Sequence, residues 1–561
     1  MTERGHSPSA AGQGDHASEP KEQQPVSHKS PSRAQTTTAA DEGSQHPPPT
    51  GARLAVVMVA ILLALFLVAL DRTILATAVP QIANQFHALD DINWYASAYL
   101  LTSCATQLSW GKVFSAHSTK LVLLVAVSLF EVGSALCGAA PSSTAFIVGR
   151  AIAGVGSAGI FSGVTVVIAQ IVPLQKRPIY VGLMGSIFGV SSIVGPLLGG
   201  ALTDRVTWRW CFYINLPIGG FTLVVLCLFL SVPRSRGSPR RRPWRDQLVR
   251  LDPIGSLLFL PSVVCFLLAL QWGGSSYPWG NGRIVALFVV AGVLAIAFGA
   301  VQIWRQEDAT VPPRIVRQRS VLSGTVFALC VGGAMISTLY TLALWFQAVQ
   351  QTSAVQSGID TIPMVLALVV GSVASGAVIT RTGYYVPWMY VATVLMATGA
   401  GLMTTFDVDT RHPAWIGYQV LFGLGVGTGM QQASLAAQTV LAMKDVSVGV
   451  SLMFFAQSLG GALFVAIAQA LFLDHLSARL PAVPGLDVAS VLAAGARNLA
   501  DVVPADRLPD VLRIYNRALR RSFIVSLAVA CLMILPTMAM EWRTVKKKNP
   551  PKNEKAADSA A

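Results

Sequence analysis

Charged residues are scarce in this chain. They make up 12% of its 561 residues, about half of the roughly 25% that is usual in soluble domains, whereas hydrophobic residues make up 53%. The mean hydropathy of +0.56 over such a length excludes a soluble globular protein and a protein with a single membrane anchor. The sequence therefore predicts an all-α integral membrane protein that crosses the bilayer many times.

Several sequence motifs are also absent, and each absence removes a class of protein. No GxxxxGK(S/T) occurs, which argues against ATP-driven transport, and no HExxH occurs, which argues against an intramembrane metalloenzyme. The seven cysteines show no CxxC spacing, so we infer neither a disulfide framework nor a zinc site. No Asn-x-Ser/Thr occurs, so we expect no N-glycosylation. We expect no catalytic residue, no metal and no cofactor.

The beginning of the chain differs in composition from the remainder. Residues 1–52 are rich in Ser, Pro, Gln and Thr and have almost no large apolar side chains, which predicts a disordered cytoplasmic tail. Beyond this tail lie fourteen apolar runs, each of about 20 residues or more, which is the length that a transmembrane helix needs. These runs are residues 54–78, 94–114, 120–140, 143–170, 178–203, 211–232, 252–271, 283–304, 321–347, 359–380, 386–405, 413–440, 447–473 and 522–541.

Basic residues are distributed unevenly between the loops. If the amino terminus lies in the cytoplasm, the short inside loops hold 17 Lys and Arg, whereas the short outside loops hold 4. This bias supports fourteen spans with both termini cytoplasmic. The net charge of +14 could indicate nucleic acid binding in a soluble protein, but the membrane-facing loops explain it here, so we expect the lipid bilayer and no nucleic acid as a partner.

Ionisable side chains interrupt the first, third and fourth apolar runs, at Asp71 and Arg72, at Glu131 and at Arg150. Such groups cost about 2.5–3.5 kcal/mol each at membrane depth and usually face a bundle interior or a water-filled path. With a rise of about 1.5 Å per residue, Asp71 lies roughly 25 Å and Glu131 roughly 16 Å from the inner surface, and Arg150 roughly 10 Å from the outer surface. These depths are compatible with one shared polar site in the outer half of the bilayer.

Five stretches carry a family resemblance. They are Leu70-Asp71-Arg72-Thr73-Ile74 with Val79-Pro80-Gln81-Ile82, then Gly149-Arg150-Ala151-Ile152-Ala153-Gly154-Val155-Gly156, then Gly189, Gly195-Pro196 and Gly199-Gly200, then Trp208-Arg209-Trp210 with Asn215-Leu216-Pro217, and Leu268-Ala269-Leu270-Gln271-Trp272-Gly273-Gly274. Together they resemble the motifs of the fourteen-span drug:H⁺ antiporters of the major facilitator superfamily, in particular the fungal toxin and multidrug efflux pumps.

The resemblance implies a major facilitator fold with 14 transmembrane helices arranged as 6+2+6. We expect an amino-terminal six-helix half at 53–232, a two-helix insertion with basic cytoplasmic loops at 233–320 and a carboxyl-terminal six-helix half at 321–541. A long extracellular loop, which could contain short helices such as Pro509 to Arg520, is expected at 474–521, and a basic cytoplasmic tail at 542–561. A faint second copy of the loop between spans two and three, Gly376 to Gly383, fits two related halves.

The resemblance also implies a function: a monomeric secondary active transporter, not an enzyme, that exports a small hydrophobic organic compound such as a toxin, secondary metabolite or drug. Export would proceed in exchange for protons, by alternating access, across the cell membrane or alternatively the vacuolar membrane. A proton-coupled importer of a nutrient or iron chelate is a second interpretation, although the glycine-rich fifth run favours export by resemblance. A membrane sensor with a transporter-like body is a third, and the short, simple tail argues against it.

The buried ionisable residues suggest how protons could be coupled to transport. Burial disfavours the charged form of a carboxyl group, whereas a nearby arginine favours it. Movement of the arginine would therefore switch the carboxyl between holding and releasing a proton. We expect Asp71 to be the main proton carrier, Arg150 its modulator, and Glu131 a second carrier or a contact for a cationic substrate.

Each of these residues also has a structural interpretation. Asp71 could pair with Arg72, although adjacent helical residues point about 100° apart and pair poorly. Glu131 could be a hydrogen-bonding residue that fixes helix packing, and Arg150 could bind carbonyl groups at helix ends. Gly195 and Pro196 of the glycine-rich motif could bend and pack the fifth helix, with or without a conformational role in antiport.

The substrate pocket is expected between the two halves, by family resemblance. Glutamine amides and aromatic faces on the helices of the carboxyl-terminal half suit a neutral or weakly polar organic molecule, although several could simply bond neighbouring helices. The candidates are Trp345, Phe346, Gln347, Gln431, Gln432, Gln438, Phe455 and Gln457.

One loop departs from the superfamily pattern. Between spans two and three the family reads approximately GxLaDrxGrkxxl, whereas this chain has Ser115 in place of the aspartate and Ser118 in place of the second glycine. The charge-relay gating associated with that motif is therefore in question for residues 111–120.

Overall fold

The computed structural model describes residues 51–88, 91–232, 251–274, 276–484, 486, 491 and 499–546. The predicted disordered tail therefore lies outside the described residues, apart from Gly51 and Ala52. The arginine-rich part of the loop after the sixth predicted span, and most of the basic carboxyl-terminal tail, also lie outside them.

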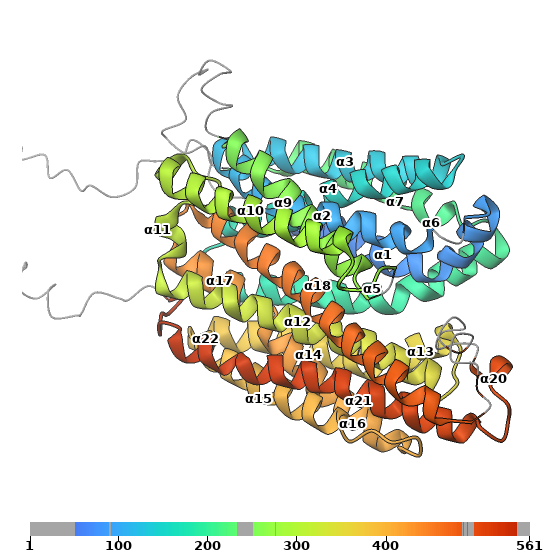
Figure 1. Ribbon diagram of the computed structural model, residues 1–561. Helices are drawn as coiled ribbons and strands as arrows, with labels where there is room; N and C mark the ends of the chain where they lie inside the picture. Colours follow the sequence, from blue (N-terminus) through green and yellow to red (C-terminus); the bar gives the residue numbers. More distant parts are fainter. Residues whose placement is uncertain are drawn as a thin grey trace, which may run out of the picture. The chain divides into compact units, whose positions relative to one another are not determined.

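The described residues form helices and no β-strand, with only two isolated β-bridges, Gly273 to Tyr277 and Tyr384 to Thr544 (Figure 1). The first group of helices is α1 (Ala52–Phe86), α2 (Ile92–Ala116), α3 (Thr119–Ala139), α4 (Ser143–Ile171), α5 (Arg177–Arg205), α6 (Trp210–Tyr213), α7 (Asn215–Phe229), α9 (Pro253–Trp272) and α10 (Gly282–Arg305). The second is α11 (Pro313–Val316), α12 (Arg319–Ala348), α13 (Ala354–Asp360), α14 (Ile362–Thr382), α15 (Val386–Met403), α16 (His412–Gly429), α17 (Gln432–Val440), α18 (Val446–Arg479), α20 (Leu499–Val502), α21 (Leu508–Leu532) and α22 (Ile534–Ala539).

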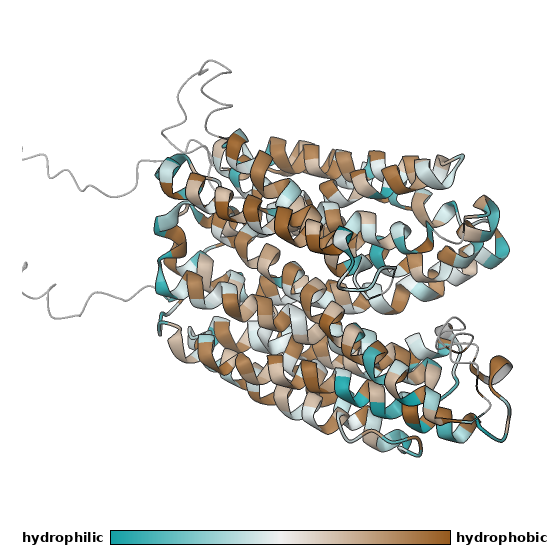
Figure 2. Cartoon of the chain, in the orientation of Figure 1, coloured by the Kyte–Doolittle hydropathy of each residue, from teal (hydrophilic) through white to brown (hydrophobic). Residues whose placement is uncertain are grey.

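Twelve helical segments of the described chain are long and apolar enough to cross a membrane. Figure 2 shows hydrophobic residues along the long helices and many of the hydrophilic residues near their ends. The two predicted spans that do not meet this criterion are 94–114, in α2, and 413–440, in α16 and α17. They carry polar side chains that the fold buries, such as Gln107, 2% exposed, and Gln419, 0% exposed. A multi-pass all-α architecture is confirmed, and the fourteen-span count remains a prediction.

The helices pack as two sets. In the first, α1 packs on α5, and α4 on α2 and α3; in the second, α12 packs on α18 and α21, and α16 on α14 and α15. The sets meet where α5 contacts α14 and where α2 and α4 contact α18. Helices α9 and α10 pack on each other, and α9 also contacts α2 and α18. In Figure 1, α11 lies at one end of the bundle and α6, α13 and α20 lie at the other; these are called the α11 end and the α6 end.

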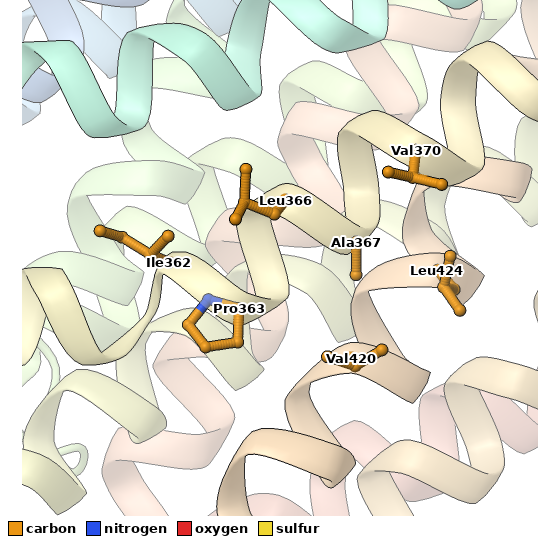
Figure 3. A pocket seen from close by; sticks show the side chains of 7 residues that line it. All are labelled: Ile362, Pro363, Leu366, Ala367, Val370, Val420 and Leu424. Carbon is orange, nitrogen blue, oxygen red and sulfur yellow. The ribbon is translucent and has the colours of Figure 1, made fainter.

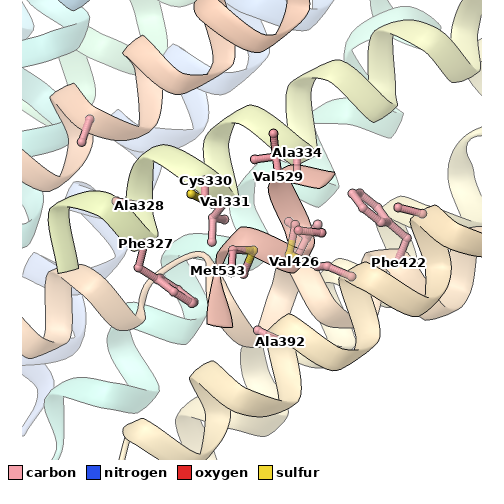
Figure 4. Close-up of a cluster of buried hydrophobic side chains, with 14 of the residues drawn as sticks. Phe327, Ala328, Cys330, Val331, Ala334, Ala392, Phe422, Val426, Val529 and Met533 are labelled. Carbon is pink, nitrogen blue, oxygen red and sulfur yellow. The ribbon is translucent and has the colours of Figure 1, made fainter. Parts of the chain in front are cut away.

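Apolar side chains fill the space between the helices of each set. Figure 4 shows part of the second set, where side chains from α12, α15, α16 and α21 meet, including Phe327, Phe422 and Met533, each at most 1% exposed. Because water cannot satisfy backbone groups within a bilayer, such helices complete their hydrogen bonds internally, and packing between side chains then determines which faces meet.

The loop predicted at 474–521 is shorter in the structure, and the short helix considered at Pro509 to Arg520 is the beginning of a longer helix, α21. Helix α18 continues to Arg479, and α21 begins at Leu508, so helices occupy both ends of this stretch. Helix α21 starts before the apolar run because its first turns are amphipathic, with Val511 and Tyr515 buried and arginines such as Arg513 exposed. A hydropathy window detects only the apolar part of such a helix.

Candidate functional site

Asp71 and Arg150 form a buried ion pair between α1 and α4. Arg150 Nη1 donates to Asp71 Oδ2 at 2.6 Å, and the side chains of Arg150 and Asp71 are 1% and 0% exposed, respectively. Arg150 Nε also donates to the carbonyl of Tyr95 at 2.9 Å, and its guanidinium lies 4.5 Å from the ring centre of Tyr99. The structure thus joins two of the three predicted coupling residues. Arg150 also binds a backbone carbonyl, that of Tyr95, as the structural interpretation of this residue predicts.

A glycine lets α4 come close enough for this pair to form. A Cβ at Gly154, one turn beyond Arg150, would overlap Thr102 Oγ1 and the carbonyl oxygen of Tyr99 on α2. Thr102 Oγ1 in turn donates to the carbonyl of Ala151 at 2.8 Å. Gly154 of the sequence motif therefore brings the backbone of α4 against α2, whereas Gly156 brings it against Phe130 of α3.

Glu131 lies apart from the pair. Its carboxyl group, on α3, packs against Gly219 of α7, where an added Cβ would overlap Oε1. The side chain is 8% exposed, and neither oxygen has a hydrogen-bond partner among the described residues. No described residue supplies the hydrogen bond that the structural interpretation of Glu131 requires, so that interpretation stays a prediction.

Arg72 does not pair with Asp71, which is bound by Arg150, so the structural interpretation of an Asp71–Arg72 pair is wrong. Its guanidinium points to α2 and α4, with Nη2 at 3.4 Å from Ser103 Oγ and the charge 5.1 Å from the ring centre of Phe161. The sequence motifs assigned Arg72 no functional role. The rotation of about 100° between adjacent helical residues was the signal that it faces a different space from Asp71.

The glycine-rich motif of α5 contacts both sets of helices. A Cβ at Gly195 would overlap Thr73, and one at Gly199 would overlap Thr77, both on α1, whereas one at Gly189 would overlap Val369 on α14. Thr73 Oγ1 donates to the carbonyl of Ser191 at 2.9 Å. Pro196 lies inside α5, and no described atom lies within 4 Å of a Cβ at Gly200. The motif therefore packs α5 against the helix that carries Asp71.

Three of the predicted pocket residues pack against other aromatic rings: Trp345 and Phe346 within the second set, and Phe455 against α9. Trp345 is 0% exposed, stacks on Phe406 with ring centres 4.5 Å apart, and donates from Nε1 to Asn516 Oδ1 at 2.9 Å. Phe346 packs edge-on against Trp415, and Phe455 against Phe259 of α9. Gln347 is half-buried on α12. Trp345 in this arrangement stabilises the helix set from within.

The remaining pocket candidates do not share one face. Gln431 and Gln432 line a cavity of about 10 Å³ between α5, α14 and α17, which is room for about one water molecule. Gln438 is 3% exposed, and neither of its amide atoms has a partner in the described part of the protein. Gln457 is half-buried on α18, and its backbone lies against Gly332 of α12. The structure therefore does not gather the predicted pocket.

A larger hollow is entirely apolar. It has a volume of about 490 Å³ and is lined by side chains of α14 and α16 (Figure 3): Ile362, Pro363, Leu366, Ala367, Val370, Val420 and Leu424. Leu366 and Val370 are 52% and 58% exposed, so the hollow is open to the surroundings of the bundle. It lacks the polar groups that orient a ligand and suits contact with lipid chains.

The segment after α10 connects the two sets at the α11 end. Lys112 Nζ at the end of α2 donates to the carbonyl of Ala309 at 2.6 Å, while Arg314 forms a two-bonded ion pair with Asp445, at the start of α18, at 2.7 and 2.8 Å. Ser115, which replaces the aspartate of the family pattern, donates to the carbonyl of Lys112. The segment that follows the inserted helix pair thus makes contacts near the loop that departs from the family pattern.

Asp252 anchors this segment. Its buried carboxylate accepts hydrogen bonds from the backbone N–H of Gly255, from Gln302 Nε2, from Arg305 Nη1 and from both the N–H and the hydroxyl of Thr310, at 2.8 to 3.0 Å. Burial alone would raise the pKa of Asp252, but these hydrogen bonds outweigh burial and lower it. The start of α9, the end of α10 and the connecting segment are therefore held by one anion.

Long apolar helices in two packed sets, with a buried ion pair in one of them, define a polytopic membrane protein of the transporter class. The sequence profile of the Major Facilitator Superfamily matches residues 61–465. The chain belongs to the major facilitator superfamily. The predictions of that family and of a transporter rather than an enzyme are therefore confirmed.

Its relatives are fungal proteins. The chain is 54% identical over 500 residues to the "Rubrofusarin-specific efflux pump aurT" of Gibberella zeae, with 89% of this chain and 91% of the relative covered. It is 50% identical over 510 residues to the "Efflux pump aflT" of Aspergillus parasiticus, with 91% and 99% covered. It is 52% identical over 500 residues to the "MFS-type efflux pump MFS1" of Trichophyton rubrum, with 89% and 93% covered.

Solved structures support the fold. The human organic anion transporter MFSD10 gives a TM-score of 0.56 at 16% identity, with 88% of this chain and all of the other covered. The proton:xylose symporter XylE gives a TM-score of 0.56 at 13% identity, with 86% and 95% covered. At such identities the likeness concerns the helix arrangement alone.

Proposed function

We propose that this protein exports small hydrophobic organic compounds in exchange for protons, by alternating access. Relatives that are at least half identical over nine-tenths of the chain carry the name efflux pump, which supports export of a toxin, secondary metabolite or drug. The Asp71–Arg150 pair is the observation that carries the proton part of the proposal, because a buried carboxylate with a single counterion is a site where proton and ion pair can compete.

We propose fourteen spans with both termini in the cytoplasm, which places the α11 end at the cytoplasmic face. The polar composition of α2 and of α16–α17 is compatible with spanning helices, because each packs between other helices: α2 against α4 and α18, and α16 against α14 and α15. The helix sets correspond to the predicted six-helix halves, and α9 and α10 to the two-helix insertion. The excess of basic residues in the loops at this end supports the orientation.

The contacts between the two sets support a state closed at the cytoplasmic end. A Cβ at Gly111, near the end of α2, would overlap Ser451, near the start of α18, and Ser162 Oγ lies 2.8 Å from Ser451 Oγ. A Cβ at Gly185, near the start of α5, would overlap Ser372 of α14. The Arg314–Asp445 pair adds a contact at the same end. Opening this end would require these contacts to separate.

The proton cycle follows from the two carboxyl groups. With this end closed, Asp71 is an anion held by Arg150, and Glu131 has no counterion among the described residues. When a proton reaches Asp71 from outside, the attraction to Arg150 falls, and α1 and α4 are free to shift against each other. Release of that proton to the cytoplasm would restore the pair. Glu131 is proposed as a second proton carrier, and no hydrogen bond between described residues joins it to the pair.

Several features of the proposal come from the family resemblance alone. The protein is proposed to act as a monomer with no cofactor other than the proton gradient, and its partners would be the substrate, protons and the lipid bilayer. The cell membrane is the proposed location, with the vacuolar membrane as the alternative.

The test uses inside-out vesicles with an acidic interior, so that the lumen corresponds to the outside of the cell. Uptake of Nile red, which is neutral, and of 1-hydroxy-2-naphthoate, which is acidic, is followed with and without a protonophore. We expect gradient-dependent uptake by the wild-type protein and its loss in Asp71→Asn. Asp204→Asn, which changes an exposed aspartate at the end of α5, is the matched control and should retain uptake.

Gradient-driven uptake by a correctly folded Asp71→Asn variant would rule out Asp71 as the proton carrier. Uptake only when the gradient is reversed would replace export by import. Size-exclusion chromatography in detergent monitors folding, and Asp71→Glu, which keeps the carboxyl group, should retain part of the activity if Asp71 acts by titration.

A further inference from the structure

Arg72 lies in the middle of α1 and faces a different side of the helix from Asp71. Its neighbours Leu70 and Asp71 are at most 1% exposed, whereas Arg72 is partly exposed. Ala76 and Pro80, one and two turns further along α1, are exposed and lie on the same face, because residues four apart on a helix lie above one another. An accessible strip of α1 therefore leads from Arg72 towards the α6 end.

The charge of Arg72 has no anionic partner among the described residues. Its nearest carboxylate in sequence, Asp71, is bound by Arg150, and no ion pair is formed by Arg72. Its Nε is buried without a hydrogen-bond partner, and Nη2 has only the long contact of 3.4 Å with Ser103. A guanidinium has five N–H donors in a planar fork that matches a carboxylate. Most of that capacity is unused here.

Aromatic rings surround the guanidinium. It lies 5.3 Å from the ring centre of Tyr99 and 5.1 Å from that of Phe161, distances at which cation–π attraction operates. Phe161 stacks on Phe188 of α5, with ring centres 5.4 Å apart and planes 14° apart. It also contacts Phe454 of α18, at 5.8 Å. The cluster thus combines one cation with flat apolar surfaces, and it includes a residue from the second helix set.

We propose that Arg72, Tyr99 and Phe161 form a binding site for the acidic group of a planar aromatic anion, such as an aromatic carboxylate or an acidic phenolate. The proposal rests on the proposed export function and specifies its substrate class. The carboxylate or phenolate oxygen would accept hydrogen bonds from the unused N–H groups of Arg72, and the ring system would pack on the aromatic side chains. Charge-assisted hydrogen bonds of this kind are about twice as strong as neutral ones.

The site also links the substrate to the conformational change. Phe161 contacts α18, and α18 contacts α2 and α4 near the α11 end. A ligand that separates these rings would act on the contact between the helix sets. The charge matters for energetics as well, because export of one anion against entry of one proton moves two charges in the direction that an inside-negative membrane potential favours.

The test measures binding to the purified full-length protein in detergent by equilibrium dialysis. The two probes are 1-hydroxy-2-naphthoate and its methyl ester, which share the ring system but differ in charge. We expect the wild-type protein to bind the acid about tenfold more tightly than the ester, as one added charge-assisted contact of about 1.4 kcal/mol would give. Arg72→Gln should remove this preference, and Arg72→Lys should retain part of it.

Arg205→Gln is the matched control, because Arg205 is an exposed arginine at the end of α5, and this variant should keep the preference. Equal binding of acid and ester by the wild-type protein, or an unchanged preference in Arg72→Gln, would overturn the proposal. Vesicle transport of Nile red by the wild-type protein decides the export function separately. An exporter of Nile red without acid preference would refute the anion site alone, whereas acid preference without transport would refute export alone.

Discussion

The two helix sets differ in what they bury. The first set, α1 to α7, buries charged side chains between its helices: Asp71 and Arg150 as a pair and Glu131 without one. The second set, α12 to α22, buries neutral groups between its helices, such as the amide of Gln438 and the indole of Trp345. The titratable groups that the proposed proton cycle uses therefore all belong to the first set.

The largest effect on stability is expected when the Asp71–Arg150 pair is broken. Arg150→Met would leave Asp71 as an unpaired buried carboxylate, which costs about 3–5 kcal/mol, and it would also remove the donor to the Tyr95 carbonyl. We expect a strongly lowered melting temperature in detergent. The double variant Asp71→Asn/Arg150→Met should recover at least half of the loss, because it removes both charges. A single variant that melts like the wild-type protein would show that the pair contributes nothing to stability.

The second prediction concerns the carboxyl group that has no partner. Gly219→Ala would place a methyl group on Oε1 of Glu131, and overpacking of this kind costs about 1–3 kcal/mol. The double variant Glu131→Ala/Gly219→Ala should regain stability, because the shortened side chain leaves room. Thermal unfolding of the two variants and of Glu131→Ala alone measures the coupling. Simple additivity of the two changes would mean that Glu131 does not occupy the space beside Gly219.

Asp252 extends the comparison of the two helix sets. It is a buried anion that lies outside both sets and is stabilised by several hydrogen bonds. We expect Asp252→Asn to cost about 1–3 kcal/mol at neutral pH, since donors to a charged group lose their acceptor. The lowered pKa of Asp252 lies below the unfolded value of about 3.9, so its contribution is complete above that value and is lost as the pH falls through the folded-state pKa.

The measurement compares unfolding of the wild-type protein and Asp252→Asn at pH 7 and at pH 3.5. The stability difference between them should be smaller at pH 3.5. A difference that does not depend on pH would show that Asp252 contributes through shape rather than charge.

The fold and the pair were largely predictable from the sequence, for physical reasons. Apolar runs must be about 20 residues long to span a bilayer, so the helix positions follow from hydropathy. Depth along each helix follows from the rise per residue, which placed Asp71 and Arg150 in the same half of the bilayer. The family motifs then supplied the superfamily, and the helices and the sequence profile agree with that assignment.

The direction in which each side chain points from its helix was not predictable. Helices that are apolar on all sides have no polar stripe to indicate an interior face, so nothing in the sequence separated Trp345, which bonds Asn516 inside the second set, from a residue that lines a substrate path. The same ambiguity hid the position of Glu131 against Gly219. These features depend on the rotation of each helix about its axis, which packing between helices determines.

The smallest effect on stability is expected in the second helix set. Gln438 is buried with neither amide atom bonded within the described part of the protein, whereas Gln107 in the first set donates to Ser162 Oγ at 2.6 Å. Gln438→Leu should therefore be neutral or stabilise by up to about 1 kcal/mol, and Gln107→Leu should destabilise by about 1 kcal/mol. Melting curves of both variants measure the contrast. If Gln438→Leu instead left stability unchanged and abolished vesicle uptake, its unused amide would be a substrate contact, as the sequence predicts, and the second set would take part in recognition as well as in movement.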